Sequence, residues 1–471
     1  MPTAVASSPI QERKFFGSGL SVEIFQRFSL LFPNFSSLEE LLPSVIAEID
    51  NRISAVLNLI LHHPDFQKLE GTWRALHRLV TVSPASADVK IRVLNIRKQE
   101  LYRSLKKYPG TTWDQGPLFK LIYESEFGTA GGEPFGCLIG DYYFDETPVS
   151  LDIMKGIARI AAAAHVPFIA GASPAILNME SWKELSNPRD FGRIFSSPEY
   201  IAWRSFRENP DSRYLTLTLP RMLARLPYNS GMSPVNGLDF SEDIGAGMHR
   251  NYCWMNAAFA LGANVIRAYS SYGWCARICG YETGGKVSLI PEGGMAALEE
   301  QFFPPLLETA IPDQLDIELA QRGFSALCLI KNGTAGVFQN GQTVYLPQVY
   351  DSYSATKNEE FAAKLPCIFA VSRFAHYIKC ILRDKIGTFR GPGEIEDFLN
   401  SWLAGYTVGD PDASDEIKAK YPLAEARVQV VRRVDRPGQF DVEIFLRPHY
   451  QLEGLKTYIK LTAQIPLRGK V

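Results

Sequence analysis

The chain has 471 residues, of which 46% are hydrophobic and 21% charged, and its formal net charge is −2. This composition is typical of a globular protein with about two to four domains, and the near-neutral charge gives no general attraction to nucleic acid or to an anionic membrane. The seven cysteines are scattered, and the N-terminal segment MPTAVASSPIQERKFF has no basic region followed by an apolar one. We therefore expect a cytoplasmic protein with reduced thiols.

Two amphipathic helices are predicted after an N-terminal arm of residues 1–35. Ser36 or Ser37 can cap the first helix, which contains Pro43 and continues to residue 63. Pro64 suits the first position of the second helix, which ends near residue 80. The apolar stripes of the two helices consist of Ile46, Ile49, Ile53, Val56, Leu57 and Ile60 in the first and Phe66, Leu69, Trp73, Leu76 and Val80 in the second.

Helices and strands then alternate along the chain, which predicts an α/β layered body. The long apolar helix at 252–271 is expected to be central, and residues 225–248 and 350–358 to form loops. We predict strands at 90–96, 135–144, 168–171, 214–219, 275–280 and 326–331, and helices at 99–107, 117–126, 150–165, 197–208, 252–271, 317–322, 365–385 and 395–404.

The C-terminal stretch, residues 425–466, has the alternation of three consecutive strands. A turn at residues 435–438 (DRPG) joins the first two, and the third occupies residues 455–465. Such strands either complete their own sheet or add to the edge of a neighbour's sheet. The charges that can keep an open edge from pairing indiscriminately are Arg432, Arg433, Lys456 and Lys460.

Three local patterns resemble catalytic or binding motifs but lack a required feature. Residues 282–286 (ETGGK) resemble a phosphate-binding loop, but Val287 replaces the Ser or Thr that would bind magnesium. Residues 171–175 (GASPA) resemble half of a nucleophile elbow around Ser173, but Pro174 would remove an oxyanion-hole N–H. His62 and His63 are adjacent on a helix and point about 100° apart, so they cannot easily share a metal. We therefore expect no enzyme activity, no cofactor and no metal site.

Several long stretches together resemble one family, the large subunit of the contractile sheath of the bacterial type VI secretion system (TssC/VipB). The resemblance covers residues 45–466. It is carried by LHHPDFQKLEGTWRALHRLV (61–80), EPFGCLIGDYYF (133–144), AAAAHVPFIAGASP (161–174), SSPEYIAWRSFRENPDSRYLTLTLPRMLARLPY (196–228), YGWCARICGYETGGKV (272–287), LPCIFAVSRFAHYIKCILRDKIG (365–387) and FLRPHYQLEGL (445–455).

The resemblance implies a phage-tail-sheath-like layered body whose terminal strands are exchanged between subunits. It also implies pairing with a small sheath subunit (TssB/VipA-like), stacking with other copies around an inner tube protein (Hcp-like) on a baseplate, and contraction that propels the tube without nucleotide hydrolysis by the sheath. No nucleic acid and no direct membrane insertion are implied. The family's longer acidic N-terminal region, which binds a AAA+ disassembly ATPase in some members, is replaced here by a short arm, so the resemblance does not extend to that partner.

Mapped on this chain, the resemblance gives an arm at residues 1–35, a body at 36–424 with two subdomains, and a strand-linkage segment at 425–471. It implies an exchanged N-terminal strand, which we place at residues 22–28, and heterodimer helices at 45–80 and 365–385. Two other functions stay open, a sheath subunit of a related phage-like injection device and an α/β enzyme with an unrecognised site. The candidate residues are Val428, Val430, Val442, Ile444, Leu455, Thr457, Ile459 and Leu461 for the inter-subunit strands, and Phe369, Phe374, Tyr377 and Ile381 for the heterodimer helix.

Overall fold

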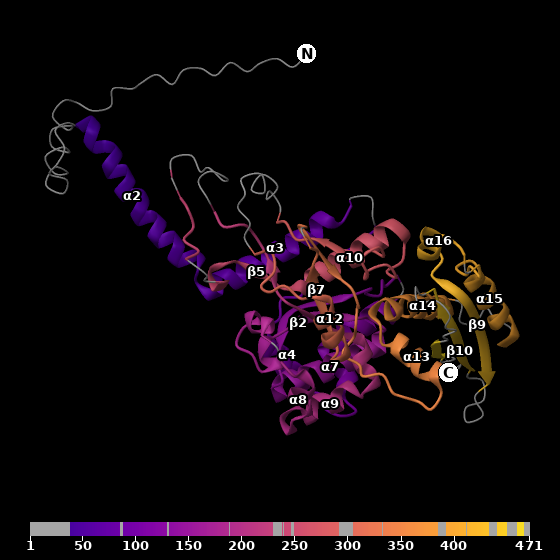
Figure 1. Ribbon diagram of the computed structural model, residues 1–471. Coiled ribbons are helices and arrows are strands. Elements are labelled where there is room, and N and C mark those ends of the chain that lie inside the picture. The colour runs from indigo at the N-terminus through magenta and orange to yellow at the C-terminus, as the bar shows by residue number, and fades with distance from the viewer. Residues whose placement is uncertain are drawn as a thin grey trace, which may run out of the picture. The chain divides into compact units, whose positions relative to one another are not determined.

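A computed structural model (Figure 1) describes residues 38–84, 88–129, 131–187, 189–228, 238, 240–245, 249–291, 305–331, 333–384, 392–410, 412–432, 440–449 and 459–465. The arm at 1–35, the cap at Ser36 or Ser37, the strand at 22–28 and the turn at 435–438 lie outside these residues. The chain divides into two compact units, one comprising residues 1–67 and 227–252 and the other residues 68–226 and 253–471.

The first unit contains helix α2 (Leu38–Leu61) and the start of helix α3 (Pro64–Val82), which passes into the second unit. Pro64 stands at the first position of α3, where its missing N–H costs nothing. Two polar contacts tie the end of α2 to the segment around residue 242. Asn58 Oδ1 accepts the backbone N–H of Asp243 at 3.0 Å, and His62 Nε2 lies 3.2 Å from Glu242 Oε1.

The second unit is built on a six-stranded sheet of order β1-β2-β3-β7-β8-β6. The pairs β1–β2, β2–β3 and β3–β7 are parallel, whereas β7–β8 and β8–β6 are antiparallel. Every residue of β2 and β3 is buried, as expected of parallel strands covered on both faces. The strands are β1 (Leu138–Phe144), β2 (Phe168–Ala172), β3 (Leu215–Leu219), β6 (Lys286–Ser288), β7 (Phe324–Leu329) and β8 (Ala335–Phe338).

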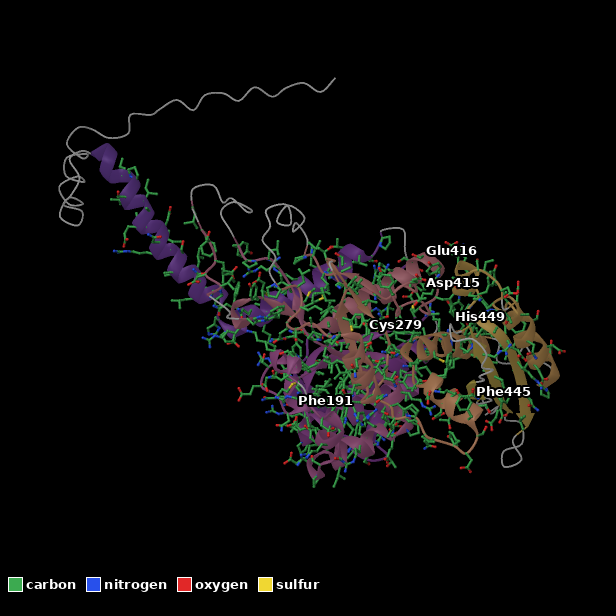
Figure 2. All side chains as sticks on the ribbon, in the orientation of Figure 1. Phe191, Cys279, Asp415, Glu416, Phe445 and His449 are labelled. Atoms are coloured by element: carbon green, nitrogen blue, oxygen red, sulfur yellow. The ribbon has the colours of Figure 1, made fainter. Side chains whose placement is uncertain are left out.

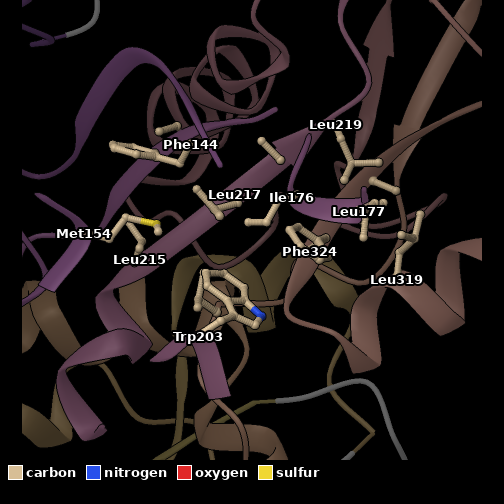
Figure 3. Packing of buried hydrophobic residues seen from close by; sticks show 14 of the residues in the cluster. Phe144, Met154, Ile176, Leu177, Trp203, Leu215, Leu217, Leu219, Leu319 and Phe324 are labelled. Atoms are coloured by element: carbon tan, nitrogen blue, oxygen red, sulfur yellow. The ribbon is translucent and has the colours of Figure 1, made fainter. Parts of the chain in front are cut away.

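Alternate residues of the central strands enter two different cores. Phe168 belongs to a core formed with α7 (Pro148–Ala164) and α9 (Ile201–Arg207), whereas Ile169 belongs to one formed with α10 (Ala257–Tyr272). Figure 3 shows the first core, in which Trp203 stacks on Phe324 with ring centroids 6.0 Å apart. The predicted α/β layered body is therefore confirmed.

Within its described residues, the C-terminal region adds four helices and a three-stranded antiparallel sheet of order β11-β10-β9. Figure 2 marks Asp415 and Glu416 at the start of α16 and Phe445 on β10. Val442 and Ile444 of β10 lie in a third core with Phe374 and Leu399. The elements are α13 (Tyr353–Ala362), α14 (Leu365–Asp384), α15 (Pro392–Ala404), α16 (Asp415–Lys420), β9 (Leu423–Arg432), β10 (Phe440–Pro448) and β11 (Ile459–Ile465).

Shorter elements connect these parts. Helices α5 and α6 flank a π-helical turn, so the predicted helix at 117–126 is present with an irregular middle. The remaining elements are α4 (Lys98–Lys106), η1 (Trp113–Gln115), α5 (Pro117–Phe119), η2 (Lys120–Glu124), α6 (Ser125–Phe127), η3 (Pro174–Leu177), η4 (Trp182–Ser186), α8 (Phe191–Ser196), η5 (Pro198–Tyr200), η6 (Pro210–Tyr214), β4 (Met222–Leu223), η7 (His249–Asn251), β5 (Trp254–Met255) and α12 (Asp313–Gln321).

Three predicted elements are wrong. Residues 90–96 are extended but form no strand, and Lys90 and Arg92 instead pair with Glu133 and Glu126 through their side chains. Residues 275–280 form turns, where the carbonyl of Ile278 accepts the side-chain amide of Asn264 at 3.1 Å rather than a strand N–H. The predicted loop at 350–358 contains the start of α13, which has no buried residue and hence no apolar stripe to reveal it.

Candidate assembly surfaces

The C-terminal sheet brings six of the strand candidates together within one chain. Val428 lies opposite Ile444, and Val430 opposite Val442. Ile444 is also paired with Leu461, and Leu446 with Ile459. Leu455 and Thr457 lie outside the described residues. Val428, Val442 and Ile444 are at most 1% exposed, so their side chains belong to this chain's own core and are not available to a neighbour.

Backbone contacts also fix the end of this sheet where β9 begins and β10 ends. The backbone N–H of His449, which follows β10 and is labelled in Figure 2, donates to the carbonyl of Pro422 at 2.9 Å. The adjoining Leu423 accepts the N–H of Val408 at 2.9 Å, so the segment after α15 lies along the start of β9. The sheet is therefore anchored to the helices that precede it.

Helix α14 distributes its four candidates between buried and exposed positions. Phe369 and Phe374 are 4% and 0% exposed, and Phe374 stacks on Trp274 with ring centroids 4.5 Å apart. Tyr377 is 38% exposed, and Ile381 is partly buried against the third core. The apolar stripe of α14 thus packs mainly within the chain, which the sequence pattern could not distinguish from packing on a partner.

The other side of α14 carries polar groups that face the end of α7. His376 Nε2 lies 2.9 Å from the carbonyl oxygen of Ala164, and Lys379 Nζ donates to that of Ala163 at 3.3 Å. Burial lowers the pKa of His376 to about 4 and the pKa of Lys379 to about 8. A neutral imidazole and an ammonium therefore satisfy carbonyls that the helix itself leaves without partners. The periodicity of α14 gave no sign of this role.

Helix α2 exposes an apolar seam with heptad spacing. Its members follow one another at intervals of 4, 3, 4, 3 and 4 residues, the pattern of positions a and d in a coiled coil. Each is between 43% and 55% exposed, and Leu59 beside them is 75% exposed. We call this set the α2 seam; it consists of Leu42, Ile46, Ile49, Ile53, Val56 and Ile60.

The heptad interval was readable in the sequence and is the signal that identifies the α2 seam. As an amphipathic face alone, the stripe did not distinguish burial within the chain from the packing on a partner that the resemblance implied for residues 45–80. Among the described residues of the first unit, the contacts of α2 instead involve its C-terminal end, through Asn58 and His62. The exposed seam is therefore a surface suited to another helix.

The residues that resembled catalytic motifs have structural roles. Ser173 Oγ accepts the backbone N–H of Ala175 at 3.4 Å and caps η3. In the segment 282–286, Gly284 has a φ of +92° and the N–H of Gly285 donates to the carbonyl of Gly280, which makes a tight turn. Within the described residues, no three His, Cys, Asp or Glu side chains gather where they could hold a metal ion.

One helix in the described part of the chain, α14, has the length and composition to cross a membrane. Within its most apolar window, 67% of the residues are buried inside the protein. This burial is typical of the core helix of a folded domain.

Two family models and one curated relative agree on one class of protein. Residues 43–345 match the VipB family model (EvpB/VC_A0108, tail sheath N-terminal domain), and residues 354–465 match VipB_2 (tail sheath gpW/gp25-like domain). The chain is 47% identical over 431 residues to the type VI secretion system sheath protein TssC1 of Pseudomonas aeruginosa, across 90% of this chain and 85% of that protein. A chain in the solved baseplate of the anti-feeding prophage is 10% identical, with a TM-score of 0.38 over 79% of this chain and 82% of that one.

Proposed function

From the premise that this chain belongs to the VipB (EvpB/VC_A0108) tail sheath family, we propose that it pairs with a smaller sheath subunit, polymerises around an inner tube and contracts to propel that tube. Its place as a subunit of a type VI secretion sheath follows from the family models and from the 47% identity to TssC1. What we propose beyond this is the pairing with a small subunit, the assembly around an inner tube and the contraction.

The observation that carries the pairing proposal is the α2 seam. Six Leu, Ile and Val side chains that are about half exposed would each gain roughly 1 kcal/mol on full burial, so the helix favours a state in which the seam is covered. From Leu42 to Ile60 the seam extends about 27 Å at 1.5 Å per residue. That length suits a helix of five turns lying alongside it.

The kind of partner follows from the residue types in the seam. Positions Ile46, Ile53 and Ile60 share one heptad position, and heptad repeats are covered by another helix through knobs-into-holes packing. Arg52 lies beside the seam and forms an ion pair with Glu48 at 2.8 Å. The two charges therefore compensate each other next to the apolar surface. We assign the covering element to an amphipathic helix of the small sheath subunit.

Helix α14 has a secondary part in this proposal. Tyr377, which is 38% exposed and receives a hydrogen bond from Arg373 at 3.1 Å, is available at the surface together with part of Ile381. Phe369 and Phe374 would hold the helix in place from inside the chain. The partner would therefore meet α14 at its exposed edge.

The C-terminal strands are the proposed link between sheath subunits. A strand added to a sheet edge gains main-chain hydrogen bonds along its whole length, so such links can persist while globular bodies move past one another. Val428, Val430, Val442, Ile444, Ile459 and Leu461 would build the receiving sheet. Leu455, Thr457 and the strand at 22–28 remain predictions from the sequence.

The remaining parts of the proposal are supported by family membership alone. The inner tube and the baseplate are the other partners, the sheath assembles in the cytoplasm, and the chain has a structural rather than an enzymatic role. Stored energy in the extended lattice, rather than nucleotide hydrolysis by the sheath, would drive contraction.

Co-expression tests this function directly. We expect the chain alone to aggregate, and the chain with its small subunit to give tubes visible by negative-stain electron microscopy. Tubes formed by the chain without a second subunit would favour the phage-like injection device. A discrete soluble oligomer with catalytic turnover would overturn the sheath function in favour of an enzyme.

A further inference from the structure

The outer edge of β9, on the side away from β10, is occupied by side chains of helix α15. The backbone N–H of Val428 donates to Asn400 Oδ1 at 2.9 Å, and Asn400 Nδ2 donates back to the carbonyl of Val428 at 3.4 Å. The N–H of Val430 donates to Glu396 Oε2 at 3.1 Å. Two consecutive outward-facing strand residues thus have partners that are not a strand.

The spacing of these two side chains matches the spacing of the strand. Residues four apart on a helix are displaced by about 6 Å along its axis, and residues two apart on a strand by about 6.7 Å. Glu396 and Asn400 therefore reach Val430 and Val428 in register. The carboxamide of Asn400 offers one donor and one acceptor, as a peptide group does, so it occupies the place of a residue in a fourth strand.

The beginning of β9 is closed by the segment that follows α15. The N–H of Leu423 donates to the carbonyl of Tyr406 at 3.3 Å, and its carbonyl accepts the N–H of Val408 at 2.9 Å. Beneath these contacts, Leu399 and Leu403 are buried in the core that also holds Val428. The closure is therefore part of a packed interface between α15 and the sheet.

The opposite edge of the sheet is β11, which is the last strand in the order β11-β10-β9. Since Val430 donates away from β10, the pair Val430–Val442 is a non-hydrogen-bonded pair, and Val442 must exchange its hydrogen bonds with Ala463 of β11. By the same alternation the backbone groups of Lys460, Thr462 and Gln464 point away from β10. No described strand pairs with that edge.

We propose that Asn400 and Glu396 are edge-guarding residues that make the C-terminal sheet one-sided, so that an extended segment of a neighbouring sheath subunit adds only beside β11. The inference rests on the proposed strand linkage and adds which edge of the C-terminal sheet receives the strand. A sheet with two open edges could take strands on both sides, which would allow branching and aggregation. A sheet with one open edge gives each subunit a single acceptor.

Hydrogen exchange of the full chain in complex with its small subunit tests the direction, measured below and above the concentration at which tubes form. We expect the amides of Val428 and Val430 to be protected equally in both states. The amides of Thr462 and Gln464 should gain about tenfold protection in tubes, the order expected for a new main-chain hydrogen bond. New protection at Val428 or Val430 on assembly would show that Asn400 and Glu396 do not close the edge of β9. Unchanged exchange at both edges would overturn the strand linkage, and the guard with it.

A double variant, Asn400→Ala with Glu396→Ala, tests the two residues themselves. In the unassembled complex the amides of Val428 and Val430 should exchange about tenfold faster, and tubes should associate laterally in light scattering. The same replacements at the exposed Asp397 and Ser401 are the matched control and should change neither readout. Glu396→Gln keeps the acceptor and should restore protection at Val430. Equal behaviour of the double variant and its control would refute the guard while leaving the linkage intact.

Discussion

His376 Nε2 lies 2.9 Å from the carbonyl oxygen of Ala164, and this contact joins the two regions that match separate tail sheath domain models. One turn further along α14, Lys379 reaches the carbonyl of Ala163, and Arg383 donates to those of Phe127 and Thr129 at 3.2 and 3.1 Å. Because these carbonyls end or follow helices, they need donors from elsewhere, and one face of α14 supplies them.

The contact at His376 predicts a loss of stability in acid. Burial holds the pKa of His376 at about 4, below its ordinary value of 6.5, so the unfolded chain binds the proton first. The contribution of neutral His376 to the free energy of unfolding is therefore present above pH 6.5 and is lost as the pH drops toward 4. The loss is about 2 kcal/mol between pH 7.5 and pH 5. His376→Gln keeps a donor for Ala164 but does not titrate.

Urea unfolding of the wild type and of His376→Gln at the two pH values gives the measurement. The variant should lose about 2 kcal/mol less than the wild type over this interval. Other groups, including His165, whose pKa is also lowered by burial, titrate in both proteins, so the difference between them isolates His376. Equal losses in the two proteins would show that His376 is not buried as a neutral base.

Trp203 gives a prediction about the central core. It is 1% exposed and stacks on Phe324, yet its indole N–H has no hydrogen-bond acceptor among the described residues. Trp203→Ala should lower the free energy of unfolding by about 3–5 kcal/mol, because it leaves a large cavity. Trp203→Phe should cost less than about half of that, because it keeps most of the ring and removes a buried donor without a partner. Chemical unfolding of both variants measures the two losses, and a loss for Trp203→Phe as large as that for Trp203→Ala would contradict the prediction.

The sequence predicted best those elements in which burial in the core determines the spacing of the apolar residues. Strands β2 and β3 and helices α7, α10 and α14 carry continuous or periodic apolar residues because the core surrounds them. Helix α13 escaped prediction because it has no buried residue. Residues 90–96 alternate like a strand, yet Lys90 and Arg92 use that alternation for ion pairs.

The candidate surfaces were less predictable because an apolar stripe does not reveal its partner. Phe374 and Ile53 both belong to helical stripes, but Phe374 is buried against Trp274 within the chain whereas Ile53 is 43% exposed. The guard at Asn400 could not be found in sequence at all. It depends on a helix and a strand that are 28 residues apart meeting in register.

Gly71 in helix α3 predicts an exception to the usual effect of replacing a helical glycine. Alanine normally stabilises a helix by up to about 1 kcal/mol relative to glycine. A Cβ at Gly71 would lie 2.5 Å from the carbonyl oxygen of Trp254, a backbone atom that cannot turn aside. Gly71→Ala should therefore lower stability by about 1–3 kcal/mol. Gly393→Ala in α15 is the matched control, since nothing lies within 4 Å of its added Cβ, and it should be neutral or stabilising. A stabilising Gly71→Ala would contradict the close approach of α3 to β5.

The α2 seam predicts a variant that separates pairing from folding. Ile53→Asp places a carboxylate in the middle of the seam, where a covering helix would have to bury it, so affinity for the small subunit should fall by about a hundredfold or more. Because Ile53 is 43% exposed in the chain itself, its unfolding midpoint should change little. Asn51→Asp, an exposed position of α2 outside the seam, is the matched control and should keep wild-type affinity. Titration of the two purified variants with the small subunit measures both effects. Equal affinities for the two variants would show that the partner does not cover the seam, and a loss confined to self-association would assign the seam to a second copy of this chain.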